Sequence, residues 1–255
     1  MLLQQTKDKL SEMKLHGMLR ALESWLESSD HDGDPTELLG LLVEAEWTAR
    51  ENRRLTNRLR QAHFPVAATV EDIDYQHPRG LQKSKMRELI TCRWIAACQN
   101  VIITGPTGIG KTWLPCALGE KACREGYRVL YTRAPRLFGD LYRARVDGSY
   151  PRMLQKLAKM RVLIIDDLGC APLDENERRD LREILEDRYS ASSTIITSQL
   201  APQHWHSFIG DETMADAICD RLVHNAHHLK LSGESLRKKR GMDTGNAEAA
   251  KEKAR

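Results

Sequence analysis

Hydrophobic residues recur at helical spacing through the first part of the chain. They predict one helix over residues 2–28, and a stretch rich in turn-forming residues, 28–35, interrupts the pattern. Thr36 can cap a second helix, which we expect to run to about residue 62. The first half of this helix is apolar and its second half is rich in arginine. The pattern therefore predicts a small all-helical N-terminal domain over residues 1–65.

The pattern changes after about residue 66. A helix is predicted over residues 84–97, and short runs rich in β-branched residues then alternate with helical segments. The five predicted strands cover residues 101–104, 129–132, 162–166, 194–198 and 228–231. Strands that are apolar on both faces and separated by helices are typical of a parallel sheet covered on both sides. We therefore expect an α/β domain with a parallel five-stranded sheet over residues 66–240. A disordered basic tail, 241–255, should follow it, because that stretch lacks apolar residues to pack.

Composition narrows the class of protein. The hydrophobic content of 41% is sufficient for a core, and 29% charged residues suit a soluble chain. No apolar run approaches the ~20 residues of a membrane span, and the first residues lack the basic-then-apolar order of a signal peptide. The six cysteines are scattered and lack paired metal-ligand spacing, so they are interpreted as reduced thiols. We expect a cytoplasmic protein without a membrane partner.

Charge is distributed unevenly along the chain. Residues 1–46 hold four Lys or Arg against ten Asp or Glu. Five arginines then fall within residues 50–60: Arg50, Arg53, Arg54, Arg58 and Arg60. Such a cluster is either a solvated helix face or a contact surface for a polyanion such as DNA, and charge alone does not decide between them.

A glycine-rich segment follows the first predicted strand. It comprises Gly105, Pro106, Thr107, Gly108, Ile109, Gly110, Lys111 and Thr112, and it fits G-x-x-x-x-G-K-[ST] at every fixed position. Glycines let successive N–H groups point at phosphate oxygens, Lys111 would reach the β/γ-phosphates, and the Thr112 hydroxyl would ligate Mg²⁺. The strand before the loop makes an ordinary strand–turn–helix connection the weaker interpretation. The segment therefore predicts binding of a nucleoside triphosphate with Mg²⁺.

Pro115 complicates this segment, because it lies four residues after Lys111 in the helix that the loop should open. An interior helical proline costs ~3 kcal/mol or more. The cost is smaller in the first helical turn, where N–H groups lack intrahelical partners.

Asp166 and Asp167 follow four apolar residues at the end of the third predicted strand. Ligands bind at this edge of open α/β sheets. Asp166 would hold Mg²⁺, and Asp167 would orient or deprotonate an attacking water. The alternative is that the pair caps a helix, since Asp is favoured there. Together with the glycine-rich loop, the pair points to hydrolysis.

Four further residues carry candidate chemistry. The fourth strand ends in Ser198 and Gln199, whose side chains could contact a γ-phosphate or water, or could form an ordinary polar turn. Arg221 and Arg237 are candidate arginine fingers, that is, cations that stabilise charge on a transferring phosphoryl group. Taken alone, each arginine is more often a surface ion pair.

These motifs resemble those of the IstB-like ATPases, the ATP-binding helper proteins of bacterial insertion sequences. That family belongs to the AAA+ class of P-loop NTPases and is similar to bacterial helicase loaders. The resemblance extends from the N-terminal helices to about residue 240. Its most specific parts are GPTGIGKTW, LIIDDLGCAPL, ITSQL and DRLVHNAHHLKLSGES.

The resemblance implies roles for single residues. It places Trp113 with the nucleotide-binding loop, gives Ser198 or Gln199 a sensor role, and makes Arg221 a finger that acts on a neighbouring subunit. Arg237 would be a second sensor arginine. It also implies an ATP-dependent homo-oligomer that binds and deforms duplex DNA and assists a partner transposase. The alternatives are a helicase loader, or a scaffold that ATP assembles on DNA with little turnover.

Overall fold

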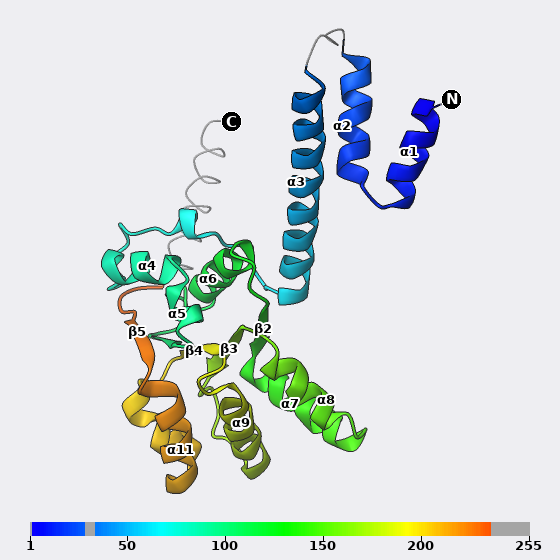
Figure 1. The fold of residues 1–255 in the computed structure, drawn as a ribbon. Helices are drawn as coiled ribbons and strands as arrows, with labels where there is room; N and C mark the ends of the chain where they lie inside the picture. Colours follow the sequence, from blue (N-terminus) through cyan, green and yellow to red (C-terminus); the bar gives the residue numbers. More distant parts are fainter. Residues whose placement is uncertain (1, 29–33, 236–255) are drawn as a thin grey trace, which may run out of the picture. The chain divides into compact units, whose positions relative to one another are not determined.

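The computed structural model describes residues 2–28 and 34–235 (Figure 1). The chain divides into two compact units, Met1–Asn57 and Arg58–Arg255. This division falls inside the helix α3 (Pro35–Ala62), whereas the sequence-based boundary lies beyond that helix, at residue 65. The last turn of α3 already belongs to the second unit, where Arg58 Nε donates to the Cys123 carbonyl at 2.8 Å. The predicted tail, 241–255, lies outside the described residues.

The N-terminal unit contains α1 (Leu2–Glu12), α2 (His16–Glu27) and most of α3. The prediction of a single helix over residues 2–28 was wrong. Lys14 adopts a left-handed conformation with φ of 59°, and the chain reverses there so that α1 and α2 lie side by side (Figure 1). Hydrophobic spacing continues through this tight turn, and for that reason it does not reveal the break.

One buried carboxylate joins α2 to α3. Glu46 accepts hydrogen bonds from the amides of Gly17 at 2.7 Å and Met18 at 3.3 Å, and from Arg50 Nε at 2.7 Å. The helices approach so closely that a Cβ at Gly17 would lie 2.6 Å from the Ala45 carbonyl oxygen. Burial opposes the charged form of Glu46. The hydrogen bonds from Arg50 and the two amides outweigh it, so the pKa of Glu46 lies below its usual value.

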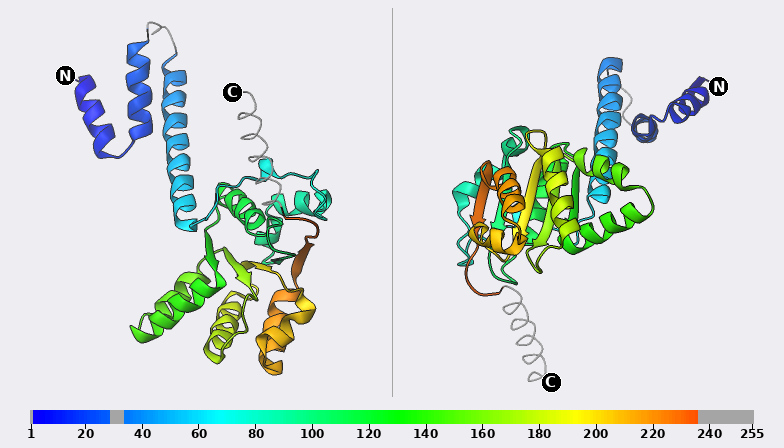
Figure 2. Two further views of the ribbon diagram at one scale, coloured as in Figure 1. Left: turned by 180° about the vertical axis from the view of Figure 1, so that it is seen from behind. Right: turned by 90° about the horizontal axis from the view of Figure 1, so that it is seen from below.

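The second unit is built on a parallel sheet of five strands, as predicted (Figure 2). The order of the strands is β2-β3-β4-β1-β5. The strands are β1 (Asn100–Thr104), β2 (Val129–Arg133), β3 (Val162–Leu168), β4 (Ser193–Ser198) and β5 (Ala226–Lys230). One buried core cluster contains four residues of the central strands β1, β3 and β4: Ile102, Leu163, Ile165 and Ile196. Crossovers between parallel strands bring their carboxyl ends to one edge of the sheet.

Helices cover both faces of this sheet. They are α4 (Lys83–Ile90), α5 (Arg93–Ala96), α6 (Trp113–Arg124), α7 (Ala134–Val146), α8 (Tyr150–Ala158), α9 (Glu175–Arg188), α10 (Trp205–Ile209) and α11 (Glu212–Val223). Two 3₁₀ turns, η1 (Val70–Asp72) and η2 (Pro202–His204), complete the described elements. The predicted helix over residues 84–97 is instead α4 and α5, because Cys92 between them is left-handed with φ of 58°. α6 covers one face, where Gly119 approaches Ile164, and α7 to α11 cover the other.

Candidate nucleotide-binding site

The glycine-rich loop connects β1 to α6, as the sequence predicted. α6 begins at Trp113 with Thr112 at the N-cap position, so the loop amides lie at a helix N-terminus. Gly105 has φ of 152°, and a Cβ there would lie 2.5 Å from the Leu231 carbonyl oxygen. Gly108 and Gly110 have φ of 83° and 97°, a region that favours glycine. The backbone therefore requires the glycines that the motif supplies.

Pro115 is the third residue of α6 and so lies in its first turn. The preceding Leu114 amide already donates to the Gly110 carbonyl at 3.1 Å, so the proline leaves the Lys111 carbonyl without the next helical donor. In the first turn this loss costs less than in the interior of a helix. α6 runs without interruption to Arg124. Pro115 therefore lies in the first helical turn, where a proline is less costly, and not in the helix interior.

Lys111 lies folded into the loop. Its side chain is buried, and Nζ donates to the Pro106 carbonyl at 2.8 Å. Arg79, buried beside the loop, donates through Nη1 to the Ile109 carbonyl at 3.4 Å and through Nη2 to the Asp74 carbonyl at 3.0 Å. The loop therefore has support from a second buried cation, which the sequence motif did not indicate.

Asp166 is almost completely buried at the end of β3 and accepts hydrogen bonds from three hydroxyl groups. Thr112 Oγ1 donates to Oδ2 at 2.9 Å, Tyr131 donates to the same oxygen at 2.6 Å, and Thr197 donates to Oδ1. Burial and the hydrogen bond to Asp166 raise the pKa of the Tyr131 hydroxyl, which therefore remains a donor. All three donors are neutral, so they orient the carboxylate without neutralising its charge.

This donor set fits Mg²⁺. A hydroxyl oxygen of Thr112 and a carboxylate oxygen of Asp166 lie 2.9 Å apart beside the phosphate loop. Mg²⁺ prefers hard oxygen ligands and commonly takes one or two from the protein, with water and substrate phosphates supplying the rest. Thr112 and Asp166 are therefore the two residues that could hold the ion.

Asp167 has an unusual backbone. Its φ is 59°, and the pairing of β3 with β4 shifts register between Ile165 and Leu168. Its amide donates to Thr197 Oγ1 at 2.9 Å, and its carboxylate pairs with Arg133 at 2.7 Å. The alternative that these aspartates cap a helix does not hold. The next helix, α9, is capped by Asp174, which forms a capping box with Glu177.

The fourth strand contributes a further residue, Thr197, beside the two that the resemblance implied. Ser198 Oγ accepts from the Leu200 amide at 3.1 Å, and Gln199 is exposed. The side chain that contacts both aspartates is that of Thr197. Sequence analysis missed Thr197, Tyr131 and Arg133, because the contacts depend on the register of three neighbouring strands.

Arg221 lies at the opposite edge of the sheet from the phosphate loop. Asn100 Nδ2, at the start of β1, donates to the Arg221 carbonyl at 2.9 Å, whereas the loop follows the end of β1. Five strand residues span about 16 Å. The Arg221 guanidinium pairs with Glu186 at 2.7 Å and Asp220 at 2.9 Å, and it lies over the Tyr189 ring at 5.2 Å. Arg237, the other candidate, lies outside the described residues.

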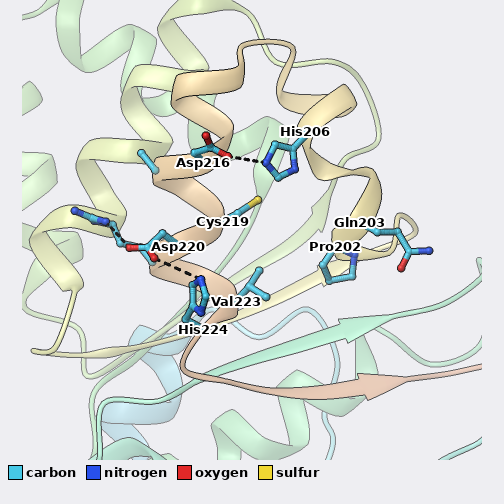
Figure 3. Close-up of a pocket in the computed structure, with 10 residues that line it drawn as sticks. Pro202, Gln203, His206, Asp216, Cys219, Asp220, Val223 and His224 are labelled. Atoms are coloured by element: carbon cyan, nitrogen blue, oxygen red, sulfur yellow. Dashed lines mark hydrogen bonds and ion pairs between the residues drawn. The ribbon is translucent and has the colours of Figure 1, made fainter.

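A surface hollow of about 690 Å³ adjoins Arg221 (Figure 3). It lies between α11 and the η2–α10 segment, and its walls carry the pairs His206–Asp216 and His224–Asp220 at 3.0 and 3.5 Å.

The arginine cluster of α3 is divided among several contacts. Arg50 binds Glu46, Arg54 binds Glu51 at 2.6 Å, and Arg58 binds the Cys123 carbonyl. Arg53, Arg54 and Arg60 are exposed, and Arg60 interacts with a further residue of the chain. Arg53 and Arg54 are therefore the members whose replacement should disturb the fold least.

The sheet order, the loop between β1 and α6, and the paired aspartates on β3 define a P-loop NTPase of the AAA+ type. The chain belongs to the family of IstB-like ATP binding proteins, whose sequence model matches residues 8–244.

Named relatives agree with this family. The chain is 51% identical over 239 residues to the insertion sequence protein y4pL of Sinorhizobium fredii, whose name describes it as ATP-binding. The match covers 93% of this chain and 98% of that protein. It is 35% identical over 237 residues to the protein named as ATP-binding in insertion sequence IS21 of Pseudomonas aeruginosa, covering 92% and 89% of the two chains.

Solved structures share the fold at lower identity. The crystal structure of DnaI superposes with a TM-score of 0.56 at 21% identity and covers 69% of this chain and 93% of that one. The DnaC helicase loader gives a TM-score of 0.50 at 23% identity, with 64% and 96% covered. Neither residues 2–28 nor residues 34–235 contain a helix with the length and apolar composition of a membrane span.

Proposed function

We propose that this chain is a Mg²⁺-dependent ATPase that assembles as a homo-oligomer on duplex DNA and assists the transposase of an insertion sequence. One observation carries the proposal. A network of hydroxyl groups joins the phosphate loop, through Thr112, to Asp166, and through Thr197 to Asp167. A fold that merely bound a nucleotide would not need a second, partly exposed carboxylate in this network.

The loop would bind the triphosphate. The loop amides lie at the N-terminus of α6. On binding, Lys111 Nζ would leave the Pro106 carbonyl and donate to phosphate oxygens instead. Thr112 and Asp166 would hold Mg²⁺, which when bound offsets the charge of the phosphate oxygens. Trp113 is the first residue of α6, directly after the loop, and would lie beside the bound nucleotide.

Asp167 would orient the attacking water and accept its proton. Its side chain is 22% exposed, so water can reach it, unlike the buried Asp166. The Thr197 hydroxyl accepts a hydrogen bond from the Asp167 amide and donates one to the Asp166 carboxylate, and so it holds the two aspartates in place relative to each other. Ser198 or Gln199 would sense the γ-phosphate, as in the family pattern.

Arg221 would act on the nucleotide of a neighbouring copy. Its position at the far edge of the sheet, against Asn100, argues against contact with the nucleotide of its own chain. A finger supplied in trans stabilises charge in the transition state. This favours a homo-oligomer in which each site contains residues of two copies. Arg237 would be the second sensor arginine.

DNA binding and transposase assistance follow from the family and from charge. The relatives are proteins of insertion sequences by name. The exposed Arg53 and Arg54 could neutralise backbone phosphates, which gives affinity independent of sequence.

The test is ATP turnover by the full chain with and without duplex DNA. Wild type should hydrolyse ATP, duplex should raise the rate, and Asp167→Asn should bind ATP without hydrolysing it. No turnover in wild type under either condition, with nucleotide binding intact, would exclude the enzymatic part. An Asp167→Asn chain that assembles on DNA and still supports transposition would favour the scaffold alternative.

A further inference from the structure

The Arg221 guanidinium is bound by carboxylates of its own chain. Its Nε and Nη2 donate to the two oxygens of Glu186, at 2.7 and 3.3 Å. Its Nη1 donates to Asp220 at 2.9 Å, and the guanidinium lies over the Tyr189 ring. Three groups of the same chain therefore hold the arginine that we propose as a finger.

The contact with Glu186 joins two helices of the second unit. Glu186 lies in the last turn of α9, and Arg221 lies in the last turn of α11. The end of α9 is anchored by Arg188, a buried side chain that donates to the carbonyls of Leu157 at 2.7 Å and Met160 at 2.8 Å. The Arg221 carbonyl is anchored to the start of β1. The two side chains therefore meet from anchored backbones, so rotation of the side chains is enough to separate them.

The two carboxylates change the charge that Arg221 presents. The guanidinium carries one positive charge and its two carboxylate partners carry two negative charges, so the group as a whole is negative. Phosphate oxygens are also negative, and like charges repel each other. A finger acts because it brings positive charge to the transferring phosphoryl group. Arg221 therefore cannot act in this way while both carboxylates hold it.

We propose that Glu186 is a positioning residue that holds Arg221 in an unassembled copy, and that the nucleotide of a docking neighbour separates this pair. The inference rests on the proposed function, because it concerns the regulation of the finger in the shared site. Glu186 is the restraining partner because it accepts two hydrogen bonds and belongs to a different helix from Arg221. Asp220 is adjacent to Arg221 on α11, and it also lies 3.5 Å from His224 (Figure 3).

The phosphate groups of a bound nucleotide have the chemistry to replace Glu186. A guanidinium binds a phosphate oxyanion with the same forked geometry that it uses for a carboxylate. The Glu186 side chain is 57% exposed and that of Arg221 is 26% exposed, and an ion pair open to water is weak. The restraint therefore raises the concentration at which copies engage each other productively, and it does not lower the rate of an assembled site.

The experiment measures ATP turnover per copy of the full chain on duplex DNA, as a function of protein concentration, for wild type, Glu186→Gln and Glu186→Asp. Glu186→Gln keeps the shape of the side chain and removes its charge. The concentration that gives half-maximal turnover should fall about two- to fivefold, because a larger fraction of copies has a free Arg221. Maximal turnover and KM for ATP should change little. Glu186→Asp keeps the charge and should lie closer to wild type.

Asp187→Asn is the matched control, because Asp187 is the next residue of α9 and is also exposed. It removes the same charge from the same helical turn and should leave the half-maximal concentration unchanged. An equal shift in both variants would assign the effect to net charge and overturn the restraint. A half-maximal concentration for Glu186→Gln that equals or exceeds that of wild type, at unchanged melting temperature, would overturn it as well.

Sedimentation of the same variants on duplex DNA with a non-hydrolysable ATP analogue separates this inference from the proposed ATPase. Without turnover in wild type, assembly of Glu186→Gln at a lower concentration than wild type, lost when Arg221→Ala is added, supports the restraint and overturns the ATPase. Turnover in wild type with no gain in the assembly of Glu186→Gln overturns the restraint and leaves the ATPase. Absence of both turnover and any gain in assembly overturns both.

Discussion

The Thr197 hydroxyl accepts a hydrogen bond from the Asp167 amide at 2.9 Å while it donates to the Asp166 carboxylate. One buried hydroxyl therefore serves two neighbouring aspartates that play different parts in the proposed chemistry. It also supports the left-handed backbone of Asp167, a conformation that is costly for a residue other than glycine.

Replacing Thr197 by valine should impair turnover more than replacing Ser198 by alanine. Valine matches the shape of threonine but leaves the Asp167 amide without its acceptor, a loss of about 1–3 kcal/mol for a buried group. We expect kcat for Thr197→Val to fall about tenfold or more, with a smaller change in ATP affinity. Steady-state kinetics and nucleotide binding check this. The reverse order of the two variants would contradict the role proposed for Thr197.

Replacing Arg53 and Arg54 together by alanine should weaken binding to duplex DNA of any sequence. Each lost phosphate contact lowers the slope of log K against log salt by about 0.9, so the double variant should lose nearly two. Arg58 is left intact, because its bond to the Cys123 carbonyl makes it part of the fold.

The control for charge is a double variant of Arg179 and Arg182 on α9, both exposed. DNA titrations at several salt concentrations provide the measurement. Equal slopes for wild type and the α3 variant would identify the arginine cluster as a solvated helix face.

The α2–α3 pairing should depend on the charge of Glu46. Its pKa in the folded chain is lowered from the usual 4.5, so its stabilising effect is present above that value and is lost as pH falls through the folded-state pKa. Glu46→Gln should therefore speed amide exchange at Gly17 and Met18 about tenfold near pH 7, and less as the pH falls below 4.5.

NMR measures the amide exchange rates, and the ratio of the variant's rate to that of wild type is taken at each pH. In this ratio the pH dependence of intrinsic amide exchange cancels. Glu44→Gln is the control, since Glu44 is an exposed residue of the same helix. A ratio that stays constant from neutral to acidic pH would contradict an ionised role for Glu46.

The strands, the phosphate loop and the two aspartates could be predicted because each signal is local. An apolar run followed by a glycine pattern specifies β1 and the loop without reference to the rest of the chain. The helix breaks at Lys14 and Cys92 were missed, because residues other than glycine adopt the left-handed conformation there. Thr197 and Arg133 were missed for another reason. Their contacts with Asp166 and Asp167 require the register of β2, β3 and β4 and the irregularity near Asp167.

Under the proposed function, hydrolysis occurs at a site shared between two copies of the chain. Mixing two inactive variants on duplex DNA tests this arrangement. Asp167→Asn retains Arg221, and Arg221→Ala retains Asp167, while Arg179→Ala serves as an active surface control. Alone, each variant should be nearly inactive, since a finger contributes about 10³–10⁵ in rate. In an equal mixture about a quarter of the sites should join an intact Asp167 to a neighbour's Arg221, so turnover should recover to roughly that fraction of wild type. A mixture that assembles on DNA but remains as inactive as its components would contradict the claim.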